Sequence, residues 1–270
     1  MKQKVVILIF THRSEPSEFE RLSFGQCFKI LGNHPTRLVC PKGLDISAYK
    51  AIAPNLIADF IDPKWFCSLR DYNLLKVLPW LYRRYSKYEF MLTYELDAYV
   101  FRDELRYWCD QGWDYIGAPW FEDFYKCAYD SKVFGVGNSG FSLRRIPSCL
   151  NILNQIQKEK IKSLIKSLIR RRVSIRTFVA KMLSPAKLFA PFEGRGWINS
   201  DDLFWCLVAQ PIFKSFKIPP YEVARRFAFE ANARRLYDEC ERELPFGCHK
   251  WELLQPDFWR EFMPIYHIEP

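Results

Sequence analysis

Residues 88–104 read YEFMLTYELDAYVFRDE, and this stretch decides the fold. The apolar run Phe90–Leu92 predicts a buried strand that ends in two carboxylates, Glu95 and Asp97. Residues i and i+2 share one face of an extended chain, so we expect both carboxylates to point into the crevice where open α/β sheets bind ligands. Two hard oxygen ligands there suit Mg²⁺ or Mn²⁺ held with substrate phosphates. The alternative is an edge strand with two solvated or arginine-paired acids.

Strand and helix patterns alternate on both sides of this stretch. Pro79 is expected to kink the helix that leads into it. The alternation predicts an α/β fold with a largely parallel sheet. The elements expected from the patterns are strands at Val5–Phe10, Thr36–Cys40 and Leu56–Ile61, a short strand with a turn within 113–120, and helices at Ser17–Leu31, Ser68–Tyr85 and from Ile146 to about Ile156.

Three further motifs carry candidate chemistry. Residues 134–144, FGVGNSGFSLR, hold three glycines that allow a close approach to a ligand, although a tight bend between strands is equally consistent. Asp201 and Asp202 precede a helix-like run; acids are favoured at a helix start, and one of them is alternatively a general base. His249, in the turn PFGCHK, is either structural or a third ligand beside the acid pair.

Composition bounds the protein class. The 270 residues suit one large domain or two small ones, and 49% apolar content supports a sizeable core. Nine cysteines, an odd number without a Cys-x-x-Cys pair, argue against a disulfide framework or a thiolate zinc site and for a reducing cytosol. The sequence shows neither an 18-residue apolar run nor a signal-peptide cleavage site, so we expect no membrane-spanning helix.

One segment carries the excess charge. The chain has a net charge of +9, and residues 158–187 contain ten lysines or arginines and one acid, so the rest is close to neutral. A solvated helix packed on the core and a helix on an anionic membrane are equally consistent with the pattern. Nucleic acid is the weakest of the three interpretations because no nucleic-acid motif accompanies the charge. The apolar positions at helical spacing are Ile161, Leu164, Ile165, Leu168 and Ile169.

Two of these motifs together resemble a known family. Glu95-Leu96-Asp97 after an apolar strand resembles the Asp-x-Asp motif of GT-A fold glycosyltransferases that use nucleotide sugars. DYIGAPW at 114–120 and GNSGFSLR at 137–144 are similar to a poorly characterised family of glycosyltransferase-like domains common in bacterial surface-polysaccharide loci. The resemblance covers about residues 5–255, except an apparent basic helical insertion at about 151–190. Glu95, Ser139 and Asp201 depart from the family's usual Asp, Gly and Glu.

The resemblance implies a single GT-A domain over residues 1–270 that transfers sugar from a nucleoside-diphosphate sugar to a glycan or lipid-linked acceptor. It implies a cytoplasmic enzyme of surface-polysaccharide biosynthesis. Attachment to the inner face of the membrane through residues 158–187 stays one interpretation of the charge pattern beside the solvated helix. Inversion with Asp202 as base is expected; retention is the alternative. The implied site residues are Asp97, Glu95 and His249 for Mn²⁺ or Mg²⁺, Thr11, His12 and Arg13 for the nucleotide, Asn138, Ser139 and Gly140 for the sugar, and Asp202 or Asp201 as general base.

Two other functions use the same residues. A metal-dependent nucleotidyltransferase would place the acids on a nucleoside triphosphate and release pyrophosphate, whereas sugar transfer releases a nucleoside diphosphate. A non-catalytic module would bind membrane or nucleic acid through residues 158–187 and keep that binding after Asp97→Ala.

Overall fold

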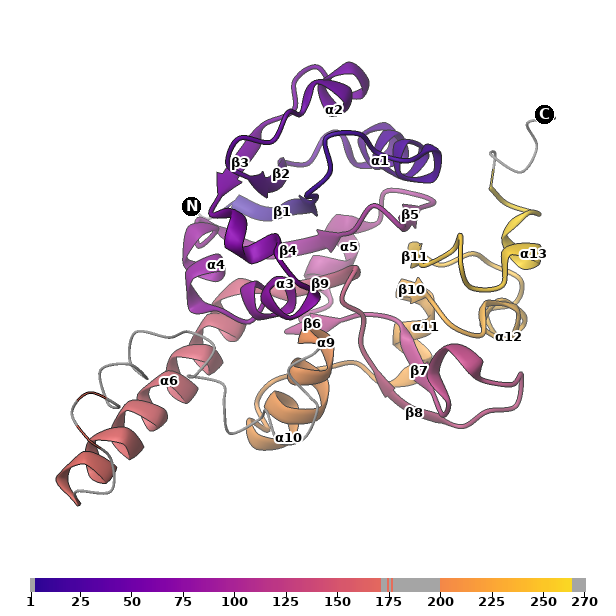
Figure 1. Ribbon diagram of the computed structural model, residues 1–270. Coiled ribbons are helices and arrows are strands. Elements are labelled where there is room, and N and C mark those ends of the chain that lie inside the picture. The colour runs from indigo at the N-terminus through magenta and orange to yellow at the C-terminus, as the bar shows by residue number, and fades with distance from the viewer. Residues whose placement is uncertain (1–2, 171–173, 175, 177–199, 264–270) are drawn as a thin grey trace.

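The centre of the computed structural model is a six-stranded sheet with the order β3-β2-β1-β4-β9-β6 (Figure 1). The residues described are 3–170, 174, 176 and 200–263. Strands β3, β2, β1 and β4 are parallel, β9 runs antiparallel to β4, and β6 runs antiparallel to β9. The predicted α/β fold with a mostly parallel sheet is therefore confirmed. The strands are β1 Gln3–Phe10, β2 Thr36–Pro41, β3 Ala58–Ile61, β4 Tyr88–Tyr94, β6 Tyr115–Ile116 and β9 Phe141–Arg145.

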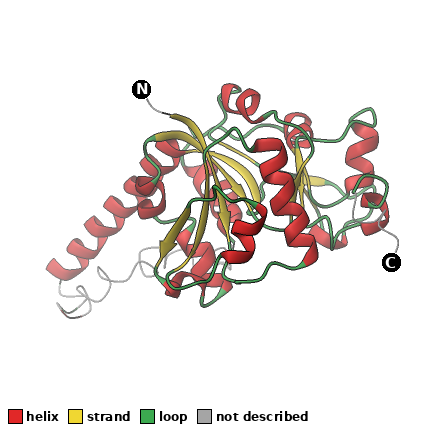
Figure 2. Cartoon of the chain, turned by 90° about the horizontal axis from the view of Figure 1, so that it is seen from above, coloured by secondary structure: helices red, strands yellow, loops and turns green. Residues whose placement is uncertain are grey.

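Helices cover both faces of this sheet (Figure 2). Alternate side chains of β1 enter separate cores: Val5, Ile7 and Ile9 face one side, and Val6, Leu8 and Phe10 face the other. Helices α1 Glu18–Leu31, α2 Ser47–Ile52 and α5 Leu105–Asp110 pack on the first core. The second core is covered by α3 Leu69–Leu75, α4 Pro79–Arg84, α6 Ile146–Ile169 and a helical segment made of α9 Asp201–Leu203, the π-helix Phe204–Ala209 and α10 Gln210–Ile212.

Local sequence signals explain where two of the helices begin. The Ser17 hydroxyl accepts a hydrogen bond from the Glu20 amide, and the Glu20 carboxylate accepts one from the Ser17 amide, which forms the capping box of α1. The helix predicted at 68–85 is instead two helices. Leu78 is extended (φ −91°, ψ 134°), as expected before a proline, and Pro79 begins α4 rather than kinking a continuous helix.

A smaller unit lies beside the carboxyl end of the parallel strands. It contains a three-stranded sheet of order β10-β11-β5 and a hairpin of β7 with β8. Its own core includes Tyr99, Phe229, Trp251 and Trp259. The elements are β5 Ala98–Val100, β7 Pro119–Phe121, β8 Val133–Val136, β10 Ala228–Phe229, β11 Gly247–His249, α11 Tyr221–Phe227, α12 Ala233–Glu239 and α13 Pro256–Trp259, with a short 3₁₀ helix at Phe124–Lys126. A second 3₁₀ helix, Pro63–Phe66, leads from β3 to α3 and packs on the second core of the main sheet.

Helix α6 projects from the body of the molecule (Figure 1). It continues without a break into the basic segment, so the described start of the predicted insertion is an extension of a core helix. The rest of that insertion, including residues 177–199, lies outside the described residues. Among the residues described, no helix is long and apolar enough to cross a membrane. All nine cysteines are described, and all are free thiols.

Candidate functional site

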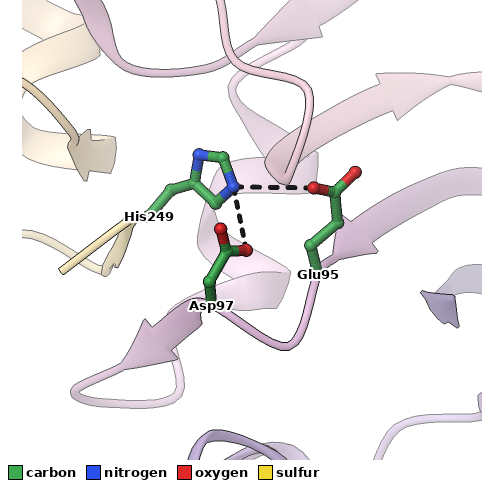
Figure 3. A group of neighbouring side chains, drawn as sticks. All are labelled: Glu95, Asp97 and His249. Atoms are coloured by element: carbon green, nitrogen blue, oxygen red, sulfur yellow. Dashed lines mark ion pairs between the residues drawn. The ribbon is translucent and has the colours of Figure 1, made fainter. Parts of the chain in front are cut away.

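The two carboxylates after β4 come from a tight turn. Glu95 lies just beyond the last strand residue, and the Ala98 amide donates to the Glu95 carbonyl at 2.9 Å. The expectation that Glu95 and Asp97 share the face of an extended chain was therefore wrong in its geometry. A short turn separates them and brings both carboxylates to one side, where they meet the same histidine (Figure 3).

His249 completes a cluster with the two acids. It ends β11, which pairs antiparallel with β5 so that His249 lies opposite Ala98, and the Lys250 amide donates to the Asp97 carbonyl at 2.9 Å. Its Nε2 atom lies 3.0 Å from Asp97 Oδ1 and 3.6 Å from Glu95 Oε2 (Figure 3). One ligand atom from each residue lies within 4.8 Å of the others. Carboxylate oxygens with one imidazole nitrogen form a donor set for a divalent cation.

The ring of His249 rests on the backbone of Gly140. A methyl group added at Gly140 would overlap the imidazole, so this glycine permits the close approach of the β9 start to β11. The neighbouring Asn138 is fully buried, and its Oδ1 accepts from the amides of Gly140 and Phe141, both at 2.8 Å. Asn138 thus holds the backbone of Gly140 in place against the His249 ring. Neither of the two cavities described below is lined by Asn138, Ser139 or Gly140, and their contact with a sugar stays a prediction.

Glu95 is held by two side chains that the sequence did not single out. The Tyr72 hydroxyl donates to Glu95 Oε1 at 2.8 Å, and the buried Lys76 ammonium contacts the same oxygen. Burial alone would raise the pKa of Glu95, but the charge of Lys76 and the contact with His249 outweigh it and hold that pKa well below its ordinary value. The carboxylate is therefore ionised, with Oε2 directed toward His249.

His249 carries the opposite shift. Burial lowers its pKa, but the charge of Asp97 and the contacts with Glu230 and Glu95 outweigh burial and raise the pKa well above its ordinary value. In the absence of a cation the imidazole is consequently protonated. A cation that binds Nε2 takes the place of that proton, as metal binding to histidine requires.

Asp201 and Asp202 have different environments although they are adjacent. Asp201 is fully buried: Arg144 Nη2 lies 2.5 Å from Oδ2, the Ser139 hydroxyl donates to Oδ1 at 2.6 Å, and Lys76 Nζ lies 3.6 Å away. Both oxygens of Asp201 are thus engaged by cations or by a hydroxyl. This commits Asp201 to holding the buried Arg144 in place.

Asp202 faces a small cavity. Its Oδ1 accepts from the Leu203 amide at 2.9 Å and from the Ser200 hydroxyl. Burial, followed by the charge of Asp201, raises the pKa of Asp202 from 3.8 to about 6. The cavity has a volume of about 190 Å³, and part of its lining is aromatic. Its other lining residues are Trp120, Phe121, Phe124, Tyr125, Ser200, Leu203, Glu230 and Ala231.

A larger cavity of about 560 Å³ opens at the carboxyl end of β1. The predicted nucleotide residues Thr11, His12 and Arg13 line it together with Glu95 and Asp97. This is the crevice outside the carboxyl ends of parallel strands where open α/β sheets bind ligands. The remaining lining residues are Phe10, Glu20, Phe66, Cys67, Ser68, Leu69, Tyr72, Leu96 and Glu252.

Three charged residues of the site were given no role from the sequence, although Arg144 ends the motif GNSGFSLR. Lys76 follows an ordinary amphipathic helix, Arg144 lies in an alternating strand, and Glu230 stands in the run Phe229–Ala231. All three are buried. A charged residue within an apolar run was the only available hint, because buried charges are rare unless they are paired. Trp120, which ends the motif DYIGAPW, lines the small cavity.

Residues 55–249 match the model of a family described as "Protein of unknown function (DUF5672)". No curated protein matches the chain. Three solved structures are similar over most of its length. One is a glycosyltransferase involved in the glycosylation of the major capsid of PBCV-1, with 9% identity, a TM-score of 0.48 and coverage of 97% of this chain and 99% of that one. Another is mouse xyloside xylosyltransferase 1 in its apo form, with 9% identity, a TM-score of 0.48 and coverage of 92% of this chain and 97% of that one. The third is an active-site mutant of LgtC, with 12% identity, a TM-score of 0.47 and coverage of 90% of this chain and 86% of that one. At such low similarity, function is argued from the side chains of the site.

Proposed function

This chain belongs to the family described as "Protein of unknown function (DUF5672)", and we propose that it is a glycosyltransferase that takes sugar from a nucleoside-diphosphate sugar with the help of a divalent cation. The observation that carries the proposal is the Glu95–Asp97–His249 cluster at the edge of the large cavity. A cation held there would meet a diphosphate that enters from the β1 side.

The residues present fit a divalent cation. His249 Nε2 is buried and makes no hydrogen bond within the described part of the chain, although two carboxylates lie beside it. Two carboxylates with one imidazole favour Mn²⁺ and accommodate Mg²⁺. When bound, the cation supplies Lewis-acid stabilisation of the charge that develops on the leaving diphosphate. Asp97, Glu95 and His249 hold it, while Tyr72 and Lys76 fix the orientation of Glu95.

Asp202 is the proposed general base for the acceptor. A base is most effective when its pKa lies near the working pH, and burial beside Asp201 raises the pKa of Asp202 to about 6. Its cavity offers aromatic rings such as Trp120 and Phe124, which suit the apolar face of a sugar ring. Asp202 would accept the proton of an acceptor hydroxyl and thereby support inversion at the transferred carbon. A glycan or lipid-linked sugar of a surface polysaccharide is the acceptor class we propose.

The decisive experiment is product analysis with purified protein. Incubation with a panel of nucleoside-diphosphate sugars and Mn²⁺ should release the nucleoside diphosphate, and a chelator should stop the release. Pyrophosphate release from nucleoside triphosphates would instead support a nucleotidyltransferase. If neither product forms across the panel with added saccharide acceptors, the proposed function is wrong.

A second proposal concerns membrane attachment through α6. The described basic side chains on its projecting half, such as Lys162, Lys166 and Arg170, are exposed. Ile165 and Ile169, which are 42% and 75% exposed, lie among them. Cationic and apolar side chains on one projecting helix suit an anionic bilayer surface. Such attachment would bring the site to lipid-linked acceptors at the membrane.

A further inference from the structure

The imidazole of His249 is held on the side opposite the cation site. Its Nδ1 atom lies 2.8 Å from Glu230 Oε1, and both side chains are buried. Glu230 directly follows β10, which pairs in parallel with β11, the strand that carries His249. In Figure 3 the second ring nitrogen points away from Asp97 and Glu95. We propose that Glu230 is a positioning residue that fixes the ring of His249 so that Nε2 is available to the cation. This inference rests on the proposed function of the cluster.

The reason lies in the hydrogen that a neutral imidazole carries. Such a ring has one N–H and one nitrogen with a free lone pair, and a carboxylate can only accept a hydrogen bond. When a cation displaces the proton from Nε2, one hydrogen remains on the ring, and Glu230 on Nδ1 and Asp97 near Nε2 compete for it. With Glu230 present, that hydrogen stays on Nδ1 and the lone pair of Nε2 faces the cation. Without it, Asp97 would draw the hydrogen to Nε2 and close the cation site.

The surroundings of Glu230 argue against a purely structural role. Within the described residues, no lysine or arginine pairs with Glu230; its contacts are His249 and the Tyr125 hydroxyl at 3.4 Å. Once a cation has displaced the Nε2 proton, His249 is neutral and Glu230 is a buried carboxylate without a charged partner, which is costly to the fold. An apolar side chain at the end of β10 would pack at lower cost, because Phe229 and Ala231 on either side are buried too. The acid is therefore better explained by its effect on His249 than by the needs of the core.

The test is the affinity of the full-length protein for Mn²⁺ alone, followed by electron paramagnetic resonance of the free ion. Glu230→Gln keeps the size of the side chain and removes the charge. We expect it to weaken Mn²⁺ binding by about 10–100-fold, the usual effect of losing an outer partner of a metal-bound histidine. Glu230→Asp, which keeps the carboxylate on a shorter side chain, should recover part of the lost affinity and also serves if the Gln variant folds poorly.

The matched control is Glu239→Gln on α12. Glu239 forms ion pairs with Arg225 at 2.8 Å and Arg235 at 2.7 Å and makes no described contact with His249. The Glu239→Gln variant should lower the midpoint of unfolding while leaving the Mn²⁺ affinity unchanged. Equal affinity in wild type and both Glu230 variants would overturn the positioning role and leave the proposed function intact. Failure of the wild type to bind Mn²⁺ at all would overturn the cation part of the proposed function and this inference together.

Discussion

Replacement of two adjacent acids should change the stability of the fold in opposite directions. Asp202 is 8% exposed and has no lysine or arginine partner among the described residues, whereas Asp201 pairs with Arg144 and Lys76. At neutral pH Asp202 is thus a buried charge held beside a like charge. We expect Asp202→Asn to stabilise the protein at that pH and Asp201→Asn to destabilise it.

The change in the free energy of unfolding expected for Asp202→Asn follows from the pKa of Asp202. Burial and the charge of Asp201 raise the pKa from 3.8 to about 6, which at about 1.36 kcal/mol per pKa unit corresponds to about 3 kcal/mol. Because the folded state favours the protonated form, this contribution is fully present below about pH 4 and is lost as pH rises through about 6. The Asp202→Asn variant would keep an oxygen that accepts from Ser200 and Leu203 without the charge. The gain at about pH 8 is therefore up to about 3 kcal/mol, and it vanishes at about pH 4.

The loss of stability expected for Asp201→Asn follows from the groups that would lose their partner. Its loss leaves the fully buried Arg144 without its carboxylate, and breaking a buried ion pair on one side costs about 3–5 kcal/mol. The Ser139 hydroxyl also loses its acceptor at 2.6 Å. The two variants differ by one position in the chain and remove the same charge, so each is the control for the other.

Urea unfolding of both variants at about pH 8 and about pH 4 measures these differences. Activity on the same samples gives an independent readout: Asp202→Asn should lose turnover by about 10²–10⁴-fold while donor binding is kept, and wild-type turnover should rise with pH through about 6. If Asp202→Asn is as destabilising at about pH 8 as Asp201→Asn, the raised pKa and the assignment of the base are both wrong.

Three further changes have defined outcomes. Asp97→Asn should weaken Mn²⁺ and nucleoside-diphosphate binding together, and calorimetry that shows unchanged affinity would remove Asp97 from the cation site. Gly140→Ala should displace the ring of His249 and lower Mn²⁺ affinity in the same titration, whereas a normal affinity would show that the backbone yields there. Charge reversal at four basic positions between 162 and 171 should abolish sedimentation with anionic liposomes at low salt but spare activity on a soluble acceptor; equal sedimentation of wild type with neutral liposomes would refute the electrostatic basis. The residues to reverse are Lys162, Lys166, Arg170 and Arg171.

The sequence was sufficient for the parts of the fold that depend on local pattern. β1, β2 and β4 are apolar runs bounded by polar residues, and α1 has a capping box that can be read directly from Ser17 and Glu20. The grouping of Glu95, Asp97 and His249 was also foreseen: the strand pattern indicated the acid pair, His249 was one possible third ligand beside it, and the resemblance to a family favoured that choice. The turn between the two acids was missed because alternation along a strand cannot show where the strand stops.

The residues that hold the site in place were beyond local pattern. Lys76 lies just after α3 and reads as a solvated helix-end lysine, yet it is buried against Glu95 and Ser139. Arg144 alternates correctly within β9, but its partner Asp201 lies on a different element far along the chain. Glu230 gains its meaning only when β10 pairs with β11. Each of these roles depends on tertiary contacts between elements that are distant in sequence, which period and propensity do not encode.

The distribution of charge around His249 explains why these distant partners matter. Lys76 and Arg144 are both buried; Lys76 lies against Glu95 and Asp201, and Arg144 pairs with Asp201. No lysine or arginine among the described residues pairs with the remaining carboxylates of Asp97, Glu230 and Asp202, which surround the same histidine or line the adjoining cavity. Glu230 and Asp202 are buried and Asp97 is partly buried, and the one positive charge of a protonated His249 does not balance them, so a further counter-charge stabilises this group. A divalent cation between Asp97 and His249 would supply this positive charge. A leaving diphosphate would need positive charge at the same place, so one cation would serve both the stability of the fold and the proposed reaction.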